Sequence, residues 1–452
     1  MNSSPMDVIS AVLRDAPGLS GDFKRDAAAY SPYWARLDDI QTRLGGAVSD
    51  NQMIVLELRR HAGDSRAAFL DRHAETLYAR LTDNYRRHVR IEQLVADAAE
   101  QVPGLAPSPG ALAYDQSLKL GDKPGCEIHQ GILLSKILAL PRAGHHLCHA
   151  MLLPRPESAE ALAKFTHDDA LDFGCVRVER RGQAARVTLS APQRLNSEDH
   201  TTLAAFETAV DVVSMDPGSK IGILRGDAVS HPKYAGRYLF GSGINLTALY
   251  HGKVPYLFYV VRDLGLVNKL FRGIARPDRD PSEVGGGTVE KLWIAMVEGF
   301  AIGGACQLLL VMDHVIAEAN AYMTLPARKE GIIPGMANLR LPRFVGERIA
   351  RQAIMGERRL DCDSAEGRMI CDEVVVPGTI EAAVDRTVEH LTGSGIVSAE
   401  GNRRAFRIGV EPFDLFRQYA AVYAREQAYC HLSPALVGNL ERHWGASNRK
   451  VS

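Results

Sequence analysis

Residues 300–310 read FAIGGACQLLL, and this order of apolar residues, two glycines and more apolar residues predicts a strand, a tight turn and a helix. The preceding run KLWIAMV, at 291–297, is typical of a strand that is covered on both faces. The glycines allow the backbone to approach a ligand closely. A helix that begins at Gly304 leaves unpaired N–H groups at its start, which suit a negatively charged oxygen. The alternative is a strand-to-helix connection whose glycines serve packing alone.

A second glycine-containing segment, YLFGSGINL at 238–246, follows the apolar run IGIL at 221–224 and also predicts a turn after a strand. Two such turns can converge on one carbonyl oxygen. With this pair the chain resembles the crotonase (enoyl-CoA hydratase/isomerase) superfamily, in which two backbone N–H groups hold the thioester oxygen of an acyl-CoA. The resemblance implies that Ile244 and Gly304 provide these N–H groups.

Further motifs extend the resemblance over residues 172–445. They are GIIPG at 331–335, LRLPRFVG at 339–346, and the passage from GERR at 356–359 to CDEVV at 371–375. The alternation of predicted strands and helices indicates an α/β fold with right-handed crossovers. The resemblance narrows this fold to the crotonase ββα spiral.

Composition limits the kinds of partner. The 452 residues include 53 basic and 54 acidic side chains, so no overall field recruits nucleic acid or an anionic membrane. No run approaches the roughly twenty apolar residues of a membrane span. Residues 1–20 lack the basic start and apolar core of a signal peptide. Together with seven scattered cysteines, this predicts a cytoplasmic protein with reduced thiols.

Two domains are expected. Residues 1–170 show helical apolar spacing and no alternating strand, which predicts an all-α N-terminal domain before a catalytic domain at 171–452. Three histidines and a cysteine at 145–149 match no standard zinc spacing, so we favour a surface or subunit-contact helix there over a metal site. Cys306, beside the glycine turn, is interpreted as core packing and not as a nucleophile.

The departures from the family decide the chemistry. Hydratases of the superfamily use two glutamates on water, and the motif match places these positions at Gln307 and Ala327. Neither side chain exchanges a proton near neutral pH, and loss of general acid–base catalysis lowers a rate by a factor of about 10² to 10⁴. We therefore expect a site that stabilises an enolate and does not hydrate its substrate.

The whole pattern, including the helical N-terminal region, is similar to the cofactor-independent dioxygenases that act on 3,5-dihydroxyphenylacetyl-CoA on the route to the dihydroxyphenylglycine of glycopeptide antibiotics. That resemblance implies reaction of an enolate with O2, without metal or flavin. The sequence accordingly offers no Gly-rich dinucleotide fingerprint and no recognisable metal-ligand set.

Three polar residues are implied at the aryl end of the pocket. Glu198, expected in the first turn of a helix, and Arg262 are assigned to the ring hydroxyls. Gln307 lies one helical turn after Gly304, so its side chain is expected to reach the reacting centre and orient substrate or peroxide. Ile332 is assigned to an apolar oxygen-binding pocket together with Arg262. A helix-dipole role for Glu198 and a solvated position for Arg262 are the alternatives.

The CoA tail is expected to bind to the loop at 231–234, to the turn at 242–247, and to two arginines, since cationic side chains suit phosphates. Arg194 and Lys233 are equally compatible with ordinary surface charges. The resemblance implies that the C-terminal helical segment at 419–444 builds trimers or dimers of trimers and closes the CoA site. The residues assigned to CoA are Arg194, His231, Pro232, Lys233, Tyr234, Ser242, Gly243, Asn245, Leu246, Thr247 and Arg425.

Two rival functions stay open. One is another crotonase-type reaction, such as hydrolysis or decarboxylation of an acyl-CoA. The other is a non-catalytic protein that binds CoA esters.

Overall fold

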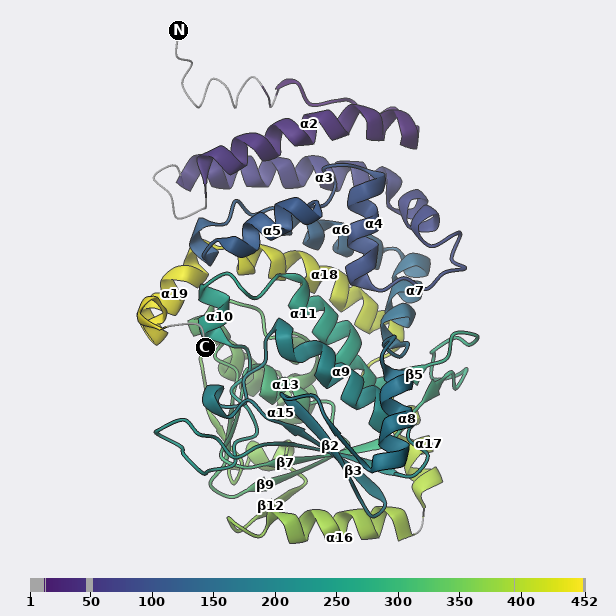
Figure 1. The fold of residues 1–452 in the computed structure, drawn as a ribbon, viewed down its shortest axis with the longest axis vertical. Coiled ribbons are helices and arrows are strands. Elements are labelled where there is room, and N and C mark those ends of the chain that lie inside the picture. The colour runs from purple at the N-terminus through teal and green to yellow at the C-terminus, as the bar shows by residue number, and fades with distance from the viewer. Residues whose placement is uncertain (1–11, 13, 46–51, 394, 450–452) are drawn as a thin grey trace.

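The computed structural model describes residues 12, 14–45, 52–393 and 395–449. Every helix or strand that it describes before Ala170 is helical, which confirms the expected N-terminal helical region. The α-helices of the region are α2 (Phe23–Leu44), α3 (Gln52–Leu81), α4 (Ile91–Gln101), α5 (Pro109–Ser117), α6 (Glu127–Ala139), α7 (Pro141–Leu152) and α8 (Ser158–Asp168). In Figure 1, α2 to α6 lie above the α/β part of the chain, and α8 runs down beside it.

The α/β part is built on a sheet with the strand order β1-β2-β3-β4-β7-β9-β12. The first three strands are antiparallel and the pairs from β3 to β12 are parallel. Strands β2 and β3 form a hairpin, in which Arg181 lies opposite Ala184. The strands are β1 (Ala170–Asp172), β2 (Val176–Arg181), β3 (Ala184–Leu189), β4 (Ile221–Gly226), β7 (Leu292–Val297), β9 (His314–Glu318) and β12 (Glu373–Val375).

Strands β3, β4 and β7 are buried along their whole length, as the apolar run at 291–297 predicts for β7. Helix α9 (His200–Met215) packs against β2 and β3, and α16 (Ile380–Gly393) packs against β7 and β9. In Figure 1, α16 lies beneath the sheet, on the side away from the N-terminal helices. This leaves the face towards α9 to meet the helical region.

A smaller sheet positions the glycine turn. Its strands have the order β11-β10-β8, with β8 (Phe300–Ile302) parallel to β10 (Tyr322–Thr324) and β10 antiparallel to β11 (Leu360–Asp361). Helix α13 (Gly304–Leu309) begins directly after β8 and Gly303, as predicted. Gly303 has a φ of 55°, a conformation that glycine adopts without steric strain.

The remaining helices and one further pair of strands complete the described part of the chain. The helices are α10 (Leu246–Tyr250), α11 (Leu257–Val261), α12 (Asn268–Arg272), α14 (Ala327–Glu330), α15 (Ala337–Met355), α17 (Ile396–Val410), α18 (Phe413–His431) and α19 (Pro434–Trp444). A two-stranded sheet pairs β5 (Ile274–Ala275) with β6 (Thr288–Val289). None of the described helices is long and apolar enough to cross a membrane.

The C-terminal helix α18 lies against α6 of the N-terminal region (Figure 1). The two helices approach closely because small residues meet between them: a Cβ atom added to Gly131 would lie 2.4 Å from Cβ of Ala428. Arg417 of α18 also donates hydrogen bonds to the carbonyl groups of Leu138 and Ala139 at the end of α6. The layer of helices therefore combines helices from the N-terminal region with α18 from the C-terminal part of the chain.

The segment from α11 to α12 is continuous, but its middle is π-helical over η3 (Arg262–Val267). The single helix that the sequence predicts between residues 255 and 272 therefore contains one wide turn. π-Helical turns often occur at functional sites. Here the wide turn begins at Arg262, which is one of the residues assigned to the aryl pocket.

Candidate active site

The two glycine turns meet, as the sequence predicts. The segment that carries Gly243 runs beside β8, where Gly241 forms a parallel bridge with Ala301. A Cβ atom added to Gly243 would lie 2.8 Å from the backbone nitrogen of Gly304 and 2.6 Å from the carbonyl oxygen of Ile302. Only a residue without a side chain allows this approach, and Gly243 also has a φ of 75°.

The backbone N–H groups of Ile244 and Gly304 stay outside the neighbouring hydrogen-bond patterns. Ile244 is bridged to Glu198 through its two neighbours, since Glu198 donates to the carbonyl of Gly243 and Asn245 donates to the carbonyl of Glu198. The hydrogen bond that opens α13 runs from Gln307 to Gly303 and leaves the N–H of Gly304 unused. Both N–H groups border the same cavity, whose lining includes Ile244 and Gly304.

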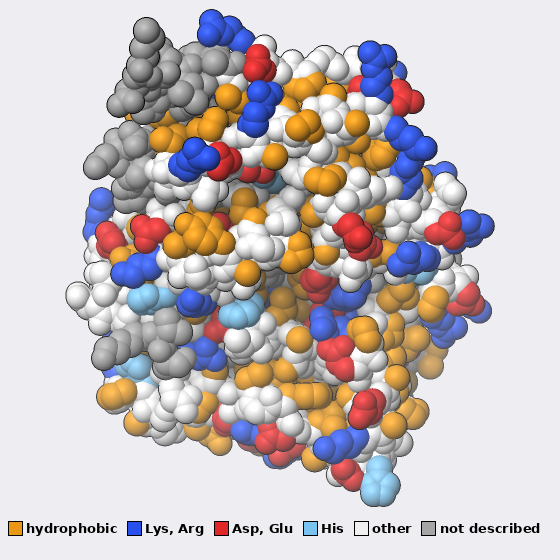
Figure 2. Space-filling view, turned by 45° about the horizontal axis from the view of Figure 1, so that its top comes forward, with side chains coloured by type: hydrophobic (Ala, Val, Ile, Leu, Met, Phe, Trp, Pro, Cys, Tyr) orange, Lys and Arg blue, Asp and Glu red, His pale blue; other side chains and the backbone are white. Residues whose placement is uncertain are grey.

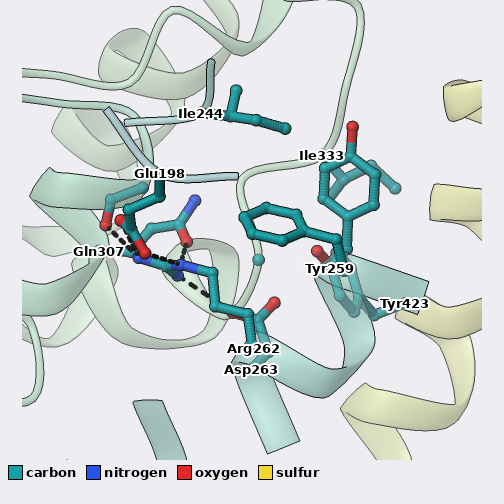
Figure 3. A pocket seen from close by; sticks show the side chains of 11 residues that line it. Glu198, Ile244, Tyr259, Arg262, Asp263, Gln307, Ile333 and Tyr423 are labelled. Carbon is teal, nitrogen blue, oxygen red and sulfur yellow. Dashed lines mark hydrogen bonds and ion pairs between the residues drawn. The ribbon is translucent and has the colours of Figure 1, made fainter. Parts of the chain in front are cut away.

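Arg262 joins two of the predicted site residues. Its Nε and Nη2 atoms donate to the two carboxylate oxygens of Glu198 at 2.8 and 2.9 Å, a bidentate pair. Its Nη1 atom donates to Oε1 of Gln307 at 3.0 Å, and Nη2 also donates to the carbonyl of Gly304. Figure 3 shows Arg262 between Glu198 and Gln307, with dashed lines to both. The solvated position for Arg262 is wrong, because only 4% of the residue is exposed.

The sequence predicts Glu198 in the first turn of a helix, but the structure places this residue before helix α9. The helix begins at His200 and is capped by Asp199, whose carboxylate accepts from the backbone of Thr201. Asp199 therefore fills the position at the helix start that the alternative, helix-dipole role gives to Glu198. The extended backbone at Glu198 instead directs its side chain to Arg262.

The charges of this network support one another. Burial lowers the pKa of Arg262, but the Glu198 carboxylate outweighs that effect and raises it overall. The adjacent Asp263 is also buried, and burial raises the pKa of its carboxyl despite Arg262. On the other side of the cavity, burial and Asp263 raise the pKa of the Tyr423 hydroxyl. Arg262 is thus held charged, while Tyr423 is held neutral.

The acyl-side cavity is small, at about 30 Å³. Figure 3 shows Tyr259, Tyr423 and Ile333 on the side opposite Glu198 and Gln307. Ile333 lines this cavity, whereas Ile332, the residue assigned to the oxygen pocket, is not among its lining residues. The lining residues are Glu198, Ile244, Phe258, Tyr259, Arg262, Asp263, Gly304, Gln307, Ile333, Gly335 and Tyr423.

A larger cavity of about 450 Å³ lies on the other side of Ile244, which lines both cavities. Most residues that the sequence assigns to CoA line this CoA-side cavity: Arg194, His231, Tyr234, Ser242, Asn245, Leu246 and Thr247. Lys329, Glu330, Trp444 and Arg449 also line it and were missed in the sequence. The C-terminal segment thus reaches this cavity through Trp444 and Arg449.

Four of the residues assigned to CoA, namely Pro232, Lys233, Gly243 and Arg425, are not among those that line either cavity. The side chain of Arg425 is 57% exposed and lies near Glu426. Lys233 lies over the ring of Tyr234, and Pro232 precedes it in the same loop. Lys329 and Arg449 supply the cationic side chains that the sequence assigned to Arg425 and Lys233.

Neither metal nor thiol chemistry is suggested by the described residues. Among them, no group of three or more His, Cys, Asp or Glu side chains could hold a metal ion. Two histidines of α7, His146 and His149, pack with His88, and the third, His145, stacks on Phe413. Cys306 is fully buried, and burial raises the pKa of its thiol to about 12. The interpretation of Cys306 as core packing is confirmed.

The chain is similar to several known proteins. A family model described as enoyl-CoA hydratase/isomerase matches residues 287–423. The (3,5-dihydroxyphenyl)acetyl-CoA 1,2-dioxygenase of Amycolatopsis orientalis is 42% identical over 365 residues, which cover 80% of this chain and 82% of the relative. The short-chain-enoyl-CoA hydratase of Clostridium acetobutylicum is 26% identical over 243 residues, 53% of this chain and 84% of the relative. The crystal structure of enoyl-CoA hydratase from Bacillus halodurans aligns with a TM-score of 0.49 and 18% identity, covering 60% of this chain and 100% of that one.

Proposed function

The chain belongs to the crotonase (enoyl-CoA hydratase/isomerase) superfamily, and we propose that it is a dioxygenase that converts 3,5-dihydroxyphenylacetyl-CoA and O2 to 3,5-dihydroxyphenylglyoxylate and free CoA. The contact of Arg262 with both Glu198 and Gln307, beside the N–H groups of Ile244 and Gly304, carries the proposal. The 42% identity to the Amycolatopsis enzyme supports the choice of substrate.

The two N–H groups bind the thioester oxygen and stabilise the negative charge that develops there when a Cα proton leaves. Each donor of this kind contributes roughly 3 to 4 kcal/mol to transition-state stabilisation. The aryl ring makes the Cα–H more acidic still. An enolate therefore forms without the two glutamates of the hydratases, which Gln307 and Ala327 replace.

The enolate carbon then reacts with O2 to form a Cα peroxide. The terminal peroxide oxygen attacks the thioester carbonyl, and the C–S bond breaks to release CoA as a thiolate. Cleavage of the O–O bond and loss of the second Cα hydrogen as a proton yield the keto group and the carboxylate. Cα is oxidised by four electrons and O2 accepts the same four, so this route needs no cofactor.

In this scheme Glu198 and Arg262 bind the ring hydroxyls, and Gln307 donates a hydrogen bond to the substrate or the peroxide. Ile333, which lines the acyl-side cavity, takes the place assigned to Ile332 in shaping the oxygen site beside Arg262. The cavity holds only a few water molecules, so the ring enters when the wall of Tyr259, Tyr423 and Ile333 moves.

The proposal extends to the setting of the enzyme: a cytoplasmic location, the pathway to dihydroxyphenylglycine of glycopeptide antibiotics, and a trimer-based homo-oligomer. Exposed apolar side chains on α17 and α18 support self-association, since Val397, Phe406 and Val422 are 79%, 71% and 64% exposed. On the face shown in Figure 2, acidic and basic side chains are interspersed, which gives no single-sign patch for nucleic acid or lipid there.

The test uses chelator-treated protein, 3,5-dihydroxyphenylacetyl-CoA and an oxygen electrode. We expect one O2 consumed for each free CoA released, with the arylglyoxylate as product. Release of CoA without O2 uptake contradicts the proposal and indicates a hydrolase. Binding of the thioester without turnover indicates a CoA-ester binding protein.

A further inference from the structure

We propose that Glu330 is the proton carrier of this site, taking the proton from Cα of the thioester and delivering it to the sulfur of the departing CoA. The inference rests on the proposed function, because it assigns the base that the enolate chemistry needs. Neither Gln307 nor Ala327 can serve, since one is an amide and the other has no polar side chain. Two carboxyl groups lie at the glycine turn: that of Glu198, which Arg262 holds in a bidentate pair, and that of Glu330.

The backbone at Gly303 defines how close Glu330 lies. A Cβ atom added to Gly303 would lie 3.8 Å from Oε1 of Glu330 and 4.0 Å from Cα of Gly243. The empty side-chain position of Gly303 thus separates the Glu330 carboxyl from the two turns that carry the N–H groups of Ile244 and Gly304. Glu330 and Ile244 both line the CoA-side cavity, so the carboxyl and one of the two N–H donors border the same space.

The position of Glu330 on its helix relates it to the missing family glutamate. Ala327 and Glu330 are the first and last residues of α14 and are three residues apart, so they lie on the same face of the helix. The carboxyl that hydratases carry at the position of Ala327 is thus displaced by one turn in this chain. From this position, one turn further along α14, the Glu330 side chain extends to the turn at Gly303.

Glu330 faces the CoA-side cavity, but it is 6% exposed. Among the described residues its carboxyl has no hydrogen-bond or ion-pair partner, and burial alone raises its pKa to about 8. A carboxyl with a pKa near neutrality can accept and return a proton within one cycle. A purely structural carboxylate at this depth is normally paired.

The titratable groups around Glu330 leave its proton exchange intact. Among these groups, Tyr259 of α11 responds to Glu330: burial and then the charge of Glu330 raise the pKa of the Tyr259 hydroxyl. The ammonium of Lys329, on the same helix, pairs with Glu357 at 2.8 Å. The remaining titratable groups that line the cavity are Arg194, His231, Tyr234, Tyr322 and Arg449.

The proton balance closes with this assignment. The Glu330 carboxylate takes one Cα proton, and the electron pair of that C–H bond becomes the enolate. When the peroxide displaces CoA, the C–S bond pair leaves on sulfur, and the Glu330 carboxyl gives its proton to the thiolate. The carboxylate is then restored, and the second Cα hydrogen leaves with the cleavage of the O–O bond.

The deciding experiment measures exchange of the Cα protons of 3,5-dihydroxyphenylacetyl-CoA in D2O without oxygen, by NMR. We expect the wild-type protein to catalyse exchange at a rate that rises about tenfold between pH 7 and pH 9, as a base with a pKa near 8 becomes ionised. Glu330→Gln should lower the exchange rate at least a hundredfold and remove this pH dependence. Glu330→Asp, which keeps a carboxyl, should restore part of the rate.

Glu347→Gln is the matched control, because Glu347 pairs with Arg351 on the exposed face of α15. It should exchange at the wild-type rate. Wild-type exchange by Glu330→Gln overturns the assignment, even when the wild-type protein consumes O2. Exchange that Glu330→Gln abolishes, in a protein that consumes no O2, supports Glu330 and overturns the dioxygenase instead. Binding of CoA by each variant, measured by calorimetry, confirms that each is folded.

Discussion

The Nη1 atom of Arg262 donates a hydrogen bond to Oε1 of Gln307 over 3.0 Å. Because a guanidinium can only donate, this contact fixes which end of the Gln307 amide faces Arg262 and leaves the NH2 group free to donate elsewhere. The side chain that replaces a catalytic glutamate is therefore oriented as a hydrogen-bond donor.

Gln307→Ala should lower O2-dependent turnover by about a hundredfold, since one donor to the developing charge is lost. Anaerobic Cα exchange should change less, because the two backbone N–H groups remain. Comparison of O2 uptake with exchange checks this split, and Gln418→Ala on α18 is the control, because Gln418 bonds only Asp414. Equal loss in both assays would mean that Gln307 acts in enolate formation.

Arg262 and Glu198 should behave as a unit in stability measurements. Arg262→Met leaves the Glu198 carboxylate buried without its bidentate partner, which should cost about 3 to 5 kcal/mol of the free energy of unfolding. Adding Glu198→Gln should recover much of this loss, because no unpaired charge then remains. Urea unfolding of the two single variants and the double variant gives the coupling. Additive losses would show that the pair is not energetically coupled.

Gly243→Ala tests the convergence of the turns. Its new methyl group would meet the nitrogen of Gly304 at 2.8 Å, so the two N–H groups must separate, and turnover should fall at least a hundredfold. Gly236→Ala is a close control, because Gly236 has a similar φ of 77° but nothing within 4 Å of the added Cβ. Both variants carry the backbone strain of a positive φ. Only Gly243→Ala should lose activity in the O2 assay.

Glu330→Gln should make the protein more stable near pH 8. The folded pKa of Glu330, about 8, is raised above its ordinary value of 4.5, so the folded state holds a proton that the unfolded state releases between these values. Wild-type stability should therefore fall as pH rises from 4.5 to 8, by at most about 1.4 kcal/mol for each pKa unit of the shift. The variant lacks this loss. Thermal melting at pH 5 and pH 8 should show its advantage growing with pH.

Much of the fold follows from apolar runs and glycines. The strands β4 and β7, the turn at Gly303 and the helix that begins at Gly304 lie where the sequence predicts them, because each depends on local patterns. The meeting of Gly243 with Gly304 was also predicted, although only through the family resemblance. The residues that contact one another across the site were likewise assigned from the positions of family motifs, and not from local patterns.

Features that depend on irregular backbone could not be predicted. A solvated position for Arg262 assumes a helix of regular period. The π-helical turn instead changes the direction of the side chains from that residue onwards. Ile332 and Ile333 are chemically alike, so only the turn before α15 determines which one lines the cavity. Glu330 carried a usable signal, its spacing of three residues from Ala327, but its burial depends on elements distant in sequence.

The packing of α18 on α6 has a consequence for synthesis of the chain. Helix α6 ends at residue 139, and its partner begins only at residue 413, so the ribosome completes the whole sheet before the surface of α6 around Gly131 is covered. Completion of the helical region must therefore wait for α18, and until then an apolar surface is open to chaperones or to aggregation. A truncation before Phe413 removes an interior wall of the helical region, and not a dispensable tail.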